Sequence, residues 1–197
     1  MATSLLLRVL TTQELAADKS LVPLVNMINN VYGRGLEGVE DLIDRYSGSD
    51  ALLDDLGTEG LCAFMLDTSQ NLRPVAVVGA KRWKGYRNRG NPYDNGGDWE
   101  IGPAASDGDP QYRKKGLVDQ CLEALYTRLL AGEQAGTVRL RMTVLEDVNA
   151  PYWRRKGYEQ DGERWVIPRG RWHKLFEYTV IDMVKEISVI PSPGMGT

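Results

Sequence analysis

Residues 110–130 read PQYRKKGLVDQCLEALYTRLL, a cationic loop with a glycine that leads directly into a predicted helix. The loop carries Arg113, Lys114 and Lys115, followed by Gly116. A helix begins with unpaired N–H groups and a partial positive charge, so this junction is typical of a phosphate-binding site. It also fits an ordinary helix that starts with solvated lysines. The helix itself is indicated by apolar residues spaced three and four apart, namely Leu117, Val118, Cys121, Leu122, Leu125, Leu129 and Leu130.

Length and composition indicate one globular domain. The chain has 197 residues, of which 42% are hydrophobic and 26% charged, so it can bury a sizeable core. We expect the domain to span residues 1–188 and to be followed by a flexible tail, 189–197. The formal net charge of -3 argues against a dedicated nucleic-acid-binding protein.

The compartment and the metal content follow from a few residues. No apolar run reaches the length of a membrane span, and the N-terminus lacks the features of a signal peptide, so we expect a cytoplasmic protein with no membrane partner. Cys62 and Cys121 each lie in an apolar segment, which predicts buried free thiols rather than a disulfide framework. His173 is the one histidine, which excludes a His-rich metal site, and we predict no metal.

The chain alternates between strand and helix signals, which predicts an α/β (α+β) domain with a mixed sheet. A parallel, right-handed crossover should join the fourth and fifth strands, and Gly102 with Pro103 predicts a bulge or a break in the fourth. The loop 84–98 fits either a substrate-facing loop or a neutral surface loop. The expected strands are 4–10, 61–66, 74–83, 99–105, 138–145, 163–167 and 175–184. The expected helices are one that begins after Thr11 or Thr12 and reaches Val31, then 39–46, 50–56, one that begins at Leu117, and 149–156.

Two short blocks carry a family resemblance. In residues 110–125, PQYRKKGLVDQCLEAL, the order of Arg113, Gly116 and a helix resembles the coenzyme-binding loop of the GNAT superfamily of acyl-CoA-dependent N-acetyltransferases. Val118 stands where that loop has Gly or Ala. Residues 151–159, PYWRRKGYE, are similar to a second family signature, with Trp153 in the position that is usually Tyr.

The resemblance implies a fold and a cofactor. The fold is a GNAT-like mixed, mostly antiparallel sheet of about seven strands, flanked by helices and splayed between strands four and five. The cofactor is acetyl-CoA or another acyl-CoA, whose pantetheine arm lies in the splay. Backbone N–H groups from about Lys114 to Val118 would bind its pyrophosphate, while Asn149 fits either a pantetheine contact or a helix N-cap. The implied cofactor-binding residues are Ala104, Ala105, Arg113, Lys114, Lys115, Gly116, Leu117, Val118 and Asn149.

The resemblance also implies the chemistry, which is attack by an amine on a thioester. Glu100 is the candidate base, although a solvent-facing strand residue is an equal interpretation. A backbone N–H near Ala105 would stabilise the oxyanion. Tyr152 is the candidate acid, because the indole of Trp153 cannot supply a proton at that step. This role requires the helix to be rotated or shifted; otherwise Tyr152 and Trp153 are aromatic residues of the core and the pocket wall.

Three functions remain open at this point. The first is acyl transfer to a small-molecule or peptide amine by a monomer or homodimer. The second is a GNAT-like fold with a degenerate acid–base site that performs other chemistry or binds CoA without acetyl transfer. Val118 and Trp153 favour it. The third is a nucleic-acid-binding protein that uses the basic stretch 81–89, which the net charge disfavours.

Overall fold

The strands form one eight-stranded sheet in the order β1-β2-β3-β4-β5-β8-β6, with β7 also paired to β8. The computed structural model describes residues 4–33, 44–85, 97–132, 137–168 and 177–188. Every strand pair is antiparallel except β4 and β5, which are parallel as predicted. The strands are β1 (Leu5–Thr11), β2 (Leu61–Asp67), β3 (Arg73–Arg82), β4 (Trp99–Ser106), β5 (Thr137–Leu145), β6 (Glu159–Gln160), β7 (Trp165–Ile167) and β8 (Tyr178–Ser188).

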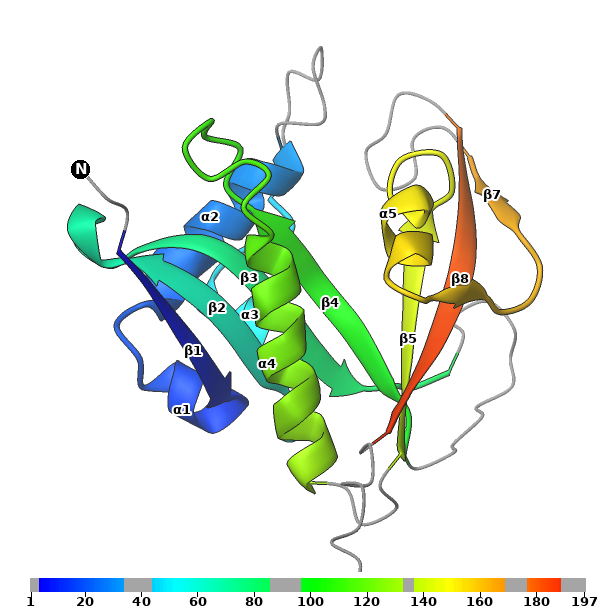
Figure 1. Cartoon of the computed structure of the whole chain (residues 1–197), viewed down its shortest axis with the longest axis horizontal. Helices are drawn as coiled ribbons and strands as arrows, with labels where there is room; N and C mark the ends of the chain where they lie inside the picture. The colour runs from blue at the N-terminus through cyan, green and yellow to red at the C-terminus, as the bar shows by residue number, and fades with distance from the viewer. Residues whose placement is uncertain (1–3, 34–43, 86–96, 133–136, 169–176, 189–197) are drawn as a thin grey trace, which may run out of the picture.

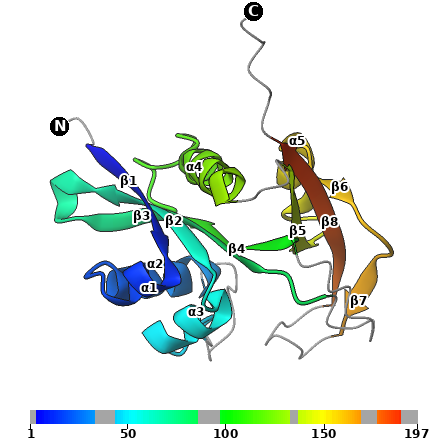
Figure 2. The same ribbon diagram turned by 90° about the horizontal axis from the view of Figure 1, so that it is seen from below.

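Helices cover both faces of the N-terminal half of the sheet. Helix α4 lies on one face, and α1, α2 and α3 lie on the other (Figures 1 and 2). Among the described helices, none has both the length and the apolar composition needed to cross a bilayer. The helices are α1 (Thr12–Ala16), α2 (Leu21–Gly33), α3 (Ser49–Leu56), α4 (Leu117–Gly132) and α5 (Ala150–Arg155), with a short 3-10 helix η1 (Thr68–Gln70) between β2 and β3.

Strand β2 shows why the sequence forms two cores. Its residues are all buried, and successive side chains of a strand point to opposite faces. Leu61, Ala63 and Met65 join the cluster under α4, while Cys62 and Phe64 join the cluster that packs on α1–α3. The continuous apolar run in the sequence therefore reflects a strand covered on both faces.

The splay between β4 and β5 is present, as the resemblance implied. Their paired residues are confined to one end, where Trp99 lies opposite Leu140 and Glu100 opposite Arg141. Beyond these pairs the strands diverge (Figure 1). At the closed end the Arg141 Nε donates to Asp98 Oδ2 at 2.5 Å. Strand β5 instead pairs with β8 from Thr137 to Leu145, so the gap opens on one side only.

The predicted bulge in β4 is also present. Ala80 pairs with Ile101 and Val78 pairs with Ala104, so Gly79 alone faces the two residues between them. A Cβ atom on Gly79 would lie 2.6 Å from the carbonyl oxygen of Gly102, so only glycine fits there. The bulge interrupts the β3–β4 ladder close to the point where β4 separates from β5.

The first predicted helix is divided in two. Thr11 caps α1 through a capping box with Glu14, which confirms the predicted start. The chain then turns between Ala17 and Ser20, because Asp18 Oδ1 accepts from the backbone N–H of Ser20 at 2.8 Å. Such a local bond competes with helix formation.

Other boundaries also differ from the prediction. Of the expected helix 39–46, residues 39–43 lie outside the described residues and 44–46 are not helical. Asn29 explains this, because its side chain donates to Tyr46 O at 2.8 Å and accepts from Tyr46 N at 3.1 Å. The expected strand 163–167 begins at Trp165. Strand β8 runs on to Ser188 because β5 offers it a partner there.

Candidate active site

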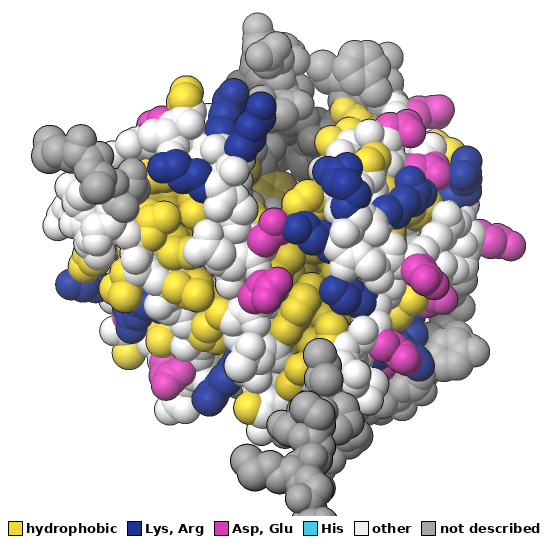
Figure 3. All heavy atoms as spheres, in the orientation of Figure 1, with side chains coloured by type: hydrophobic (Ala, Val, Ile, Leu, Met, Phe, Trp, Pro, Cys, Tyr) yellow, Lys and Arg dark blue, Asp and Glu magenta, His cyan; other side chains and the backbone are white. Residues whose placement is uncertain are grey.

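The divergence of β4 and β5 opens a cleft with a volume of about 1690 Å³. The loop before α4 forms one side of its mouth, and α5 forms the other. Figure 3 shows a hollow flanked on both sides by Lys and Arg side chains. All of the predicted site residues line this one cleft; they are Glu100, Ala104, Ala105, Arg113, Lys114, Lys115, Gly116, Leu117, Val118, Asn149 and Tyr152.

The loop before α4 has the backbone of an anion-binding turn. Lys114 and Gly116 are left-handed, with φ of 58° and 63°. A left-handed lysine is strained, and such strain persists where the surroundings require it. The first helical hydrogen bond runs from Gln120 N to Gly116 O at 3.0 Å, so the N–H groups of Leu117 and Val118 have no acceptor within the helix. Leu117 and Val118 both line the cleft, and backbone N–H groups that follow a left-handed turn are typical of an anion-binding site.

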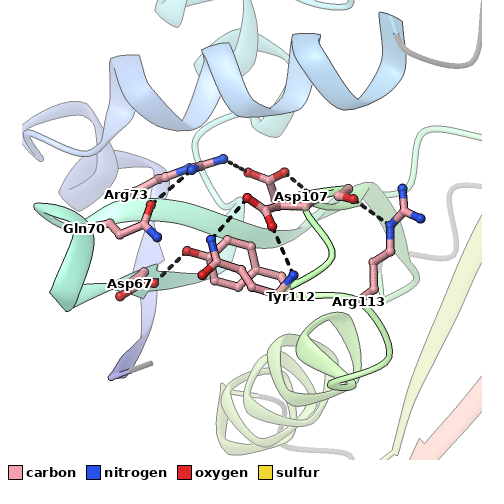
Figure 4. A network of polar contacts seen from close by, with 9 residues as sticks. Asp67, Gln70, Arg73, Asp107, Tyr112 and Arg113 are labelled. Atoms are coloured by element: carbon pink, nitrogen blue, oxygen red, sulfur yellow. Dashed lines mark hydrogen bonds and ion pairs between the residues drawn. The ribbon is translucent and has the colours of Figure 1, made fainter. Parts of the chain in front are cut away.

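A buried polar network anchors this loop to the β2–β3 hairpin (Figure 4). The Tyr112 hydroxyl donates to Asp67 Oδ2 at 2.6 Å, and Arg73 pairs with Asp107. Burial, together with the hydrogen bond to Asp67, raises the pKa of Tyr112 to about 12. These contacts fix the start of the loop against the sheet.

The cationic residues of the loop differ in how they are used. The Arg113 Nε donates to Gly108 O at 2.6 Å, which closes the preceding turn (Figure 4). Lys114 and Lys115 are exposed at the mouth. The Val118 side chain, in contrast, is half-buried and packs against the core under α4. Val118 also lines the cleft, so it contributes both to the core and to the cleft wall.

Tyr152 lies across the mouth and is bound to α4. Its hydroxyl donates to Asp119 Oδ1 at 2.5 Å, and Lys156 Nζ lies 2.6 Å from Asp119 Oδ2. Burial and the Asp119 carboxylate raise the pKa of Tyr152 above its ordinary value. Trp153, in the position that is usually Tyr in the family signature, is buried and makes edge contacts with the rings of Tyr152 and Tyr158.

Glu100 lies in the part of the cleft farther from this mouth, within a charged cluster. Lys81 Nζ is 3.4 Å from Glu100 Oε1 and 2.6 Å from Asp55 Oδ1. Tyr46 donates to the other Asp55 oxygen at 2.8 Å. Burial acts to raise the pKa of Asp55, but Lys81 and Tyr46 outweigh it and leave that pKa below its ordinary value. Lys81 is itself buried, so it does not belong to an exposed basic stretch.

The cleft edge of β4 presents the backbone of Ala104. Tyr32, from α2, donates to Ala104 O at 3.3 Å, and Ala104 N lies 3.4 Å from the same hydroxyl. Backbone groups alternate in direction along a strand, and Asp107 N donates to Val75 O of β3. The Ala105 N–H therefore points toward β3, and the donor expected near Ala105 is better supplied by Ala104. Asn149 occupies the N-cap position of α5, but its side chain makes no capping hydrogen bond.

Several sequence-based predictions concern other residues. Residues 86–96 of the predicted loop and His173 lie outside the described residues. Both cysteines are free and buried, as predicted. In the part of the chain that the structure describes, His, Cys, Asp and Glu form no group of three that could hold a metal ion.

Solved structures resemble this one over almost the whole chain. The acetyltransferase of GNAT family from Streptococcus pneumoniae has a TM-score of 0.60 at 18% identity, with 94% of this chain and 100% of that chain covered. The ribosomal-protein-S18-alanine N-acetyltransferase from Escherichia coli has a TM-score of 0.59 at 15% identity, covering 98% and 100%. A phosphinothricin acetyltransferase from Sinorhizobium meliloti, solved with AcCoA, has a TM-score of 0.57 at 16% identity, covering 96% and 94%.

The chain has the GNAT fold. The element order, the parallel β4–β5 pair and the cleft between these strands all belong to that fold, and the resemblance seen in residues 110–125 and 151–159 is confirmed at this level. No protein-family model matches the sequence, and no curated protein matches it at a significant level. Comparison of structures thus detects the GNAT fold of this chain, whereas comparison of whole sequences does not.

The structure adds residues that sequence reasoning missed. Asp119 follows Gly116 by three positions, where an acidic residue favours a helix N-terminus, so its place could have been inferred. Lys81 lines the cleft as well, because β3 pairs with β4 and places it opposite Glu100. Arg45 and Tyr32 also line the cleft. These two come from distant segments, and nothing in the sequence places either residue beside β4.

Proposed function

We propose that this chain is an acyl-CoA-dependent N-acyltransferase that moves an acetyl group from acetyl-CoA to the amine of a small molecule or peptide. The observation that carries the proposal is the cleft between β4 and β5, which ends at the strained, cationic loop before α4. An elongated ligand with a phosphate at one end fits this arrangement. The neighbours in fold named above are acetyltransferases, which supports the proposal.

The residues present fit acyl-CoA. The donors of Leu117 and Val118 and the left-handed turn at Lys114 suit a pyrophosphate, and Lys115 adds positive charge at the mouth. The exposed edge of β4 at Ala104 suits an amide-containing arm. Acetyl-CoA would supply the acetyl group activated as a thioester.

Glu100 and Tyr152 are assigned the proton transfers. An amine at neutral pH is mostly protonated, so a carboxylate must accept its proton directly or through water. Glu100 lines the cleft, and Lys81 Nζ is 3.4 Å from its Oε1. The Tyr152 hydroxyl lies on the opposite wall and would return a proton to the leaving thiolate. The Ala104 N–H, if Tyr32 moves aside, would donate to the oxyanion.

A second function is favoured by the geometry of α5. Trp153 is buried, and the Tyr152 proton is directed at Asp119 rather than into open space. A chain with these features could bind CoA and transfer no acetyl group. As to compartment, both thiols are free, and we therefore propose the cytoplasm, where reducing conditions keep them so.

Two measurements test the proposal. Calorimetry and thermal unfolding with acetyl-CoA report binding, and at about 100 times Kd the ligand should add roughly 2.7 kcal/mol of stability. Release of thiol in the presence of a panel of amines reports transfer. Charge reversal by Lys114→Glu with Lys115→Glu should weaken binding, whereas Lys19→Glu, at an exposed lysine outside the cleft, should not. Binding without thiol release would support the second function, and absence of binding would refute both.

A further inference from the structure

Arg45 projects a cation into the middle of the cleft. Its Cζ lies 4.3 Å from the ring centroid of Tyr32 and 5.4 Å from that of Tyr46. Its Nη2 lies 4.0 Å from the position that a Cβ on Gly102 would take. The guanidinium is thus held against the bulge of β4, on the side of the cleft away from the loop before α4.

Arg45 differs from the neighbouring cations of the cleft in having no ion-pair partner among the described residues. Lys81 is paired with Asp55 at 2.6 Å, and Arg141 with Asp98 at 2.5 Å. Within the described ranges, no carboxylate lies at ion-pair distance from Arg45, although it is exposed and lines the cleft. Two aromatic rings hold the guanidinium in place, which reduces the entropy that a bound anion would otherwise cost.

Glu100 lies beside Arg45 with the opposite charge. Glu100 and Gly102 are two residues apart on one strand, so they share a face and are separated by roughly 7 Å. The cleft floor therefore presents a carboxylate at Glu100 and, next to it, a guanidinium at the bulge. A ligand with an ammonium group and an anionic group a few atoms apart would match both.

We propose that Arg45 binds the carboxylate of the acceptor, so that the acceptor is a small amino carboxylate such as a free amino acid. This inference rests on the proposed function and narrows its substrate. A guanidinium matches a carboxylate through two parallel hydrogen bonds. The nearby carboxylates of Asp44, Asp55 and Glu100 disfavour a dianionic group such as phosphate, whereas a zwitterion adds no net charge to the cluster.

The test compares matched amines at saturating acetyl-CoA. The probes are the common L-amino acids, the carboxamides of the same amino acids and the amines that lack the carboxyl group, with thiol release as the readout. We expect an amino acid to be turned over with a KM at least tenfold below that of its carboxamide. Arg45→Gln should raise the KM for the amino acid roughly tenfold to hundredfold, the usual value of a charged hydrogen bond, and leave that for the carboxamide nearly unchanged. Arg45→Lys should recover part of the loss.

Arg139→Gln is the matched control, because Arg139 lies on β5 outside the cleft and pairs with Glu186 at 2.7 Å. It should change neither KM. Equal use of amino acids and carboxamides, transfer to peptide N-termini alone, or no thiol release from any amino acid while acetyl-CoA binds would each overturn the assignment of Arg45. Failure of acetyl-CoA to bind at all, measured separately by calorimetry, would instead overturn the proposed function.

Discussion

The Tyr152 hydroxyl donates to Asp119 Oδ1 at 2.5 Å and thereby ties α5 to the first turn of α4. The bond spans the mouth of the cleft, between the two elements that carry the family-like motifs. Lys156, at the end of α5, adds an ion pair, with its Nζ 2.6 Å from Asp119 Oδ2. This arrangement allows two roles for Tyr152, a proton donor in catalysis or a structural tie.

Substitution of Tyr152 by Phe separates these roles. If the hydroxyl supplies the proton to the leaving thiolate, Tyr152→Phe should lower turnover by about 10² to 10⁴ and leave acetyl-CoA affinity nearly unchanged. The pKa of Tyr152 is raised by burial and by Asp119, so the hydroxyl stays protonated at neutral and mildly alkaline pH. Ionisation of Tyr152 should therefore cause no loss of activity in that range. Steady-state kinetics with calorimetry checks both statements.

Tyr126→Phe serves as the control for that substitution. Tyr126 Oη lies 2.9 Å from Tyr158 Oη, away from the cleft, and its removal should leave turnover unchanged. A Tyr152→Phe enzyme that keeps full turnover and loses only stability would show that Tyr152 is a structural tie.

Asp119 should make the stability of the protein depend on acid pH. Burial acts to raise the pKa of Asp119, but its hydrogen bonds with Lys156 and Tyr152 outweigh this and hold the pKa below the ordinary 3.8. A lowered folded-state pKa adds stability above the unfolded-state pKa, and that stability is lost as the pH falls through the folded-state value. Asp119→Asn should therefore cost about 0.5–1 kcal/mol at pH 7 and progressively less below about pH 4.

Urea unfolding of both proteins across the acid range measures this difference. Asp54→Asn, at an exposed carboxylate on α3, is the matched control and should give a small difference at every pH. A penalty for Asp119→Asn that stays constant down to pH 2 would exclude the ion pair as its source.

Neither cysteine thiol should react with thiol reagents in the native protein. Cys62 and Cys121 are both fully buried, and burial raises the pKa of the Cys121 thiol to about 12. Because the thiolate is the reactive form, Ellman's reagent should label neither cysteine until urea is added, and then both. Rapid labelling in native buffer would contradict the buried positions and would interfere with thiol-release assays.

The sequence predicted the site best where the functional residues and the signals for turn and helix lie in the same short segment. Gly116 and the helix from Leu117 were recognisable because a glycine turn and an amphipathic period adjoin. The β4 bulge followed from Gly102 with Pro103. Arg45 and Tyr32, by contrast, reach β4 only through the packing of α2 and its connection to α3, and such tertiary neighbours leave no periodic signal.

The misplaced boundaries have side-chain causes, one local and one between distant segments. Asp18 and Asn29 each bind backbone groups that a helix would otherwise use. Their side chains compete with helix formation at a single residue, while the apolar spacing on either side still reads as helical. Spacing alone therefore could not locate either break.

Val118→Gly tests whether the Val118 side chain obstructs phosphate binding at the loop before α4. The half-buried Val118 side chain packs against the core, so its removal loses apolar contact and adds a helical glycine. We expect a loss of roughly 1–3 kcal/mol in unfolding free energy and little change in acetyl-CoA affinity, because the substitution keeps the backbone N–H donors of the turn. A clear gain in affinity would show that Val118 obstructs the phosphate position after all.

Glu100→Gln tests the base, and its matched control is Glu59→Gln. Each carboxylate faces a cation of β3, with Lys81 3.4 Å from Glu100 and Arg82 2.9 Å from Glu59, but only Glu100 lines the cleft. Both substitutions should change stability by less than about 1 kcal/mol. Glu100→Gln alone should lower turnover, by about 10² to 10⁴.

The deficit in turnover of the Glu100→Gln enzyme should shrink as the pH approaches the pKa of the amine, because a free amine needs no base to remove its first proton. A deficit that is the same at every pH would mean that Glu100 binds the acceptor without taking its proton, and equal turnover of the Glu100→Gln and Glu59→Gln enzymes would remove Glu100 from the chemistry.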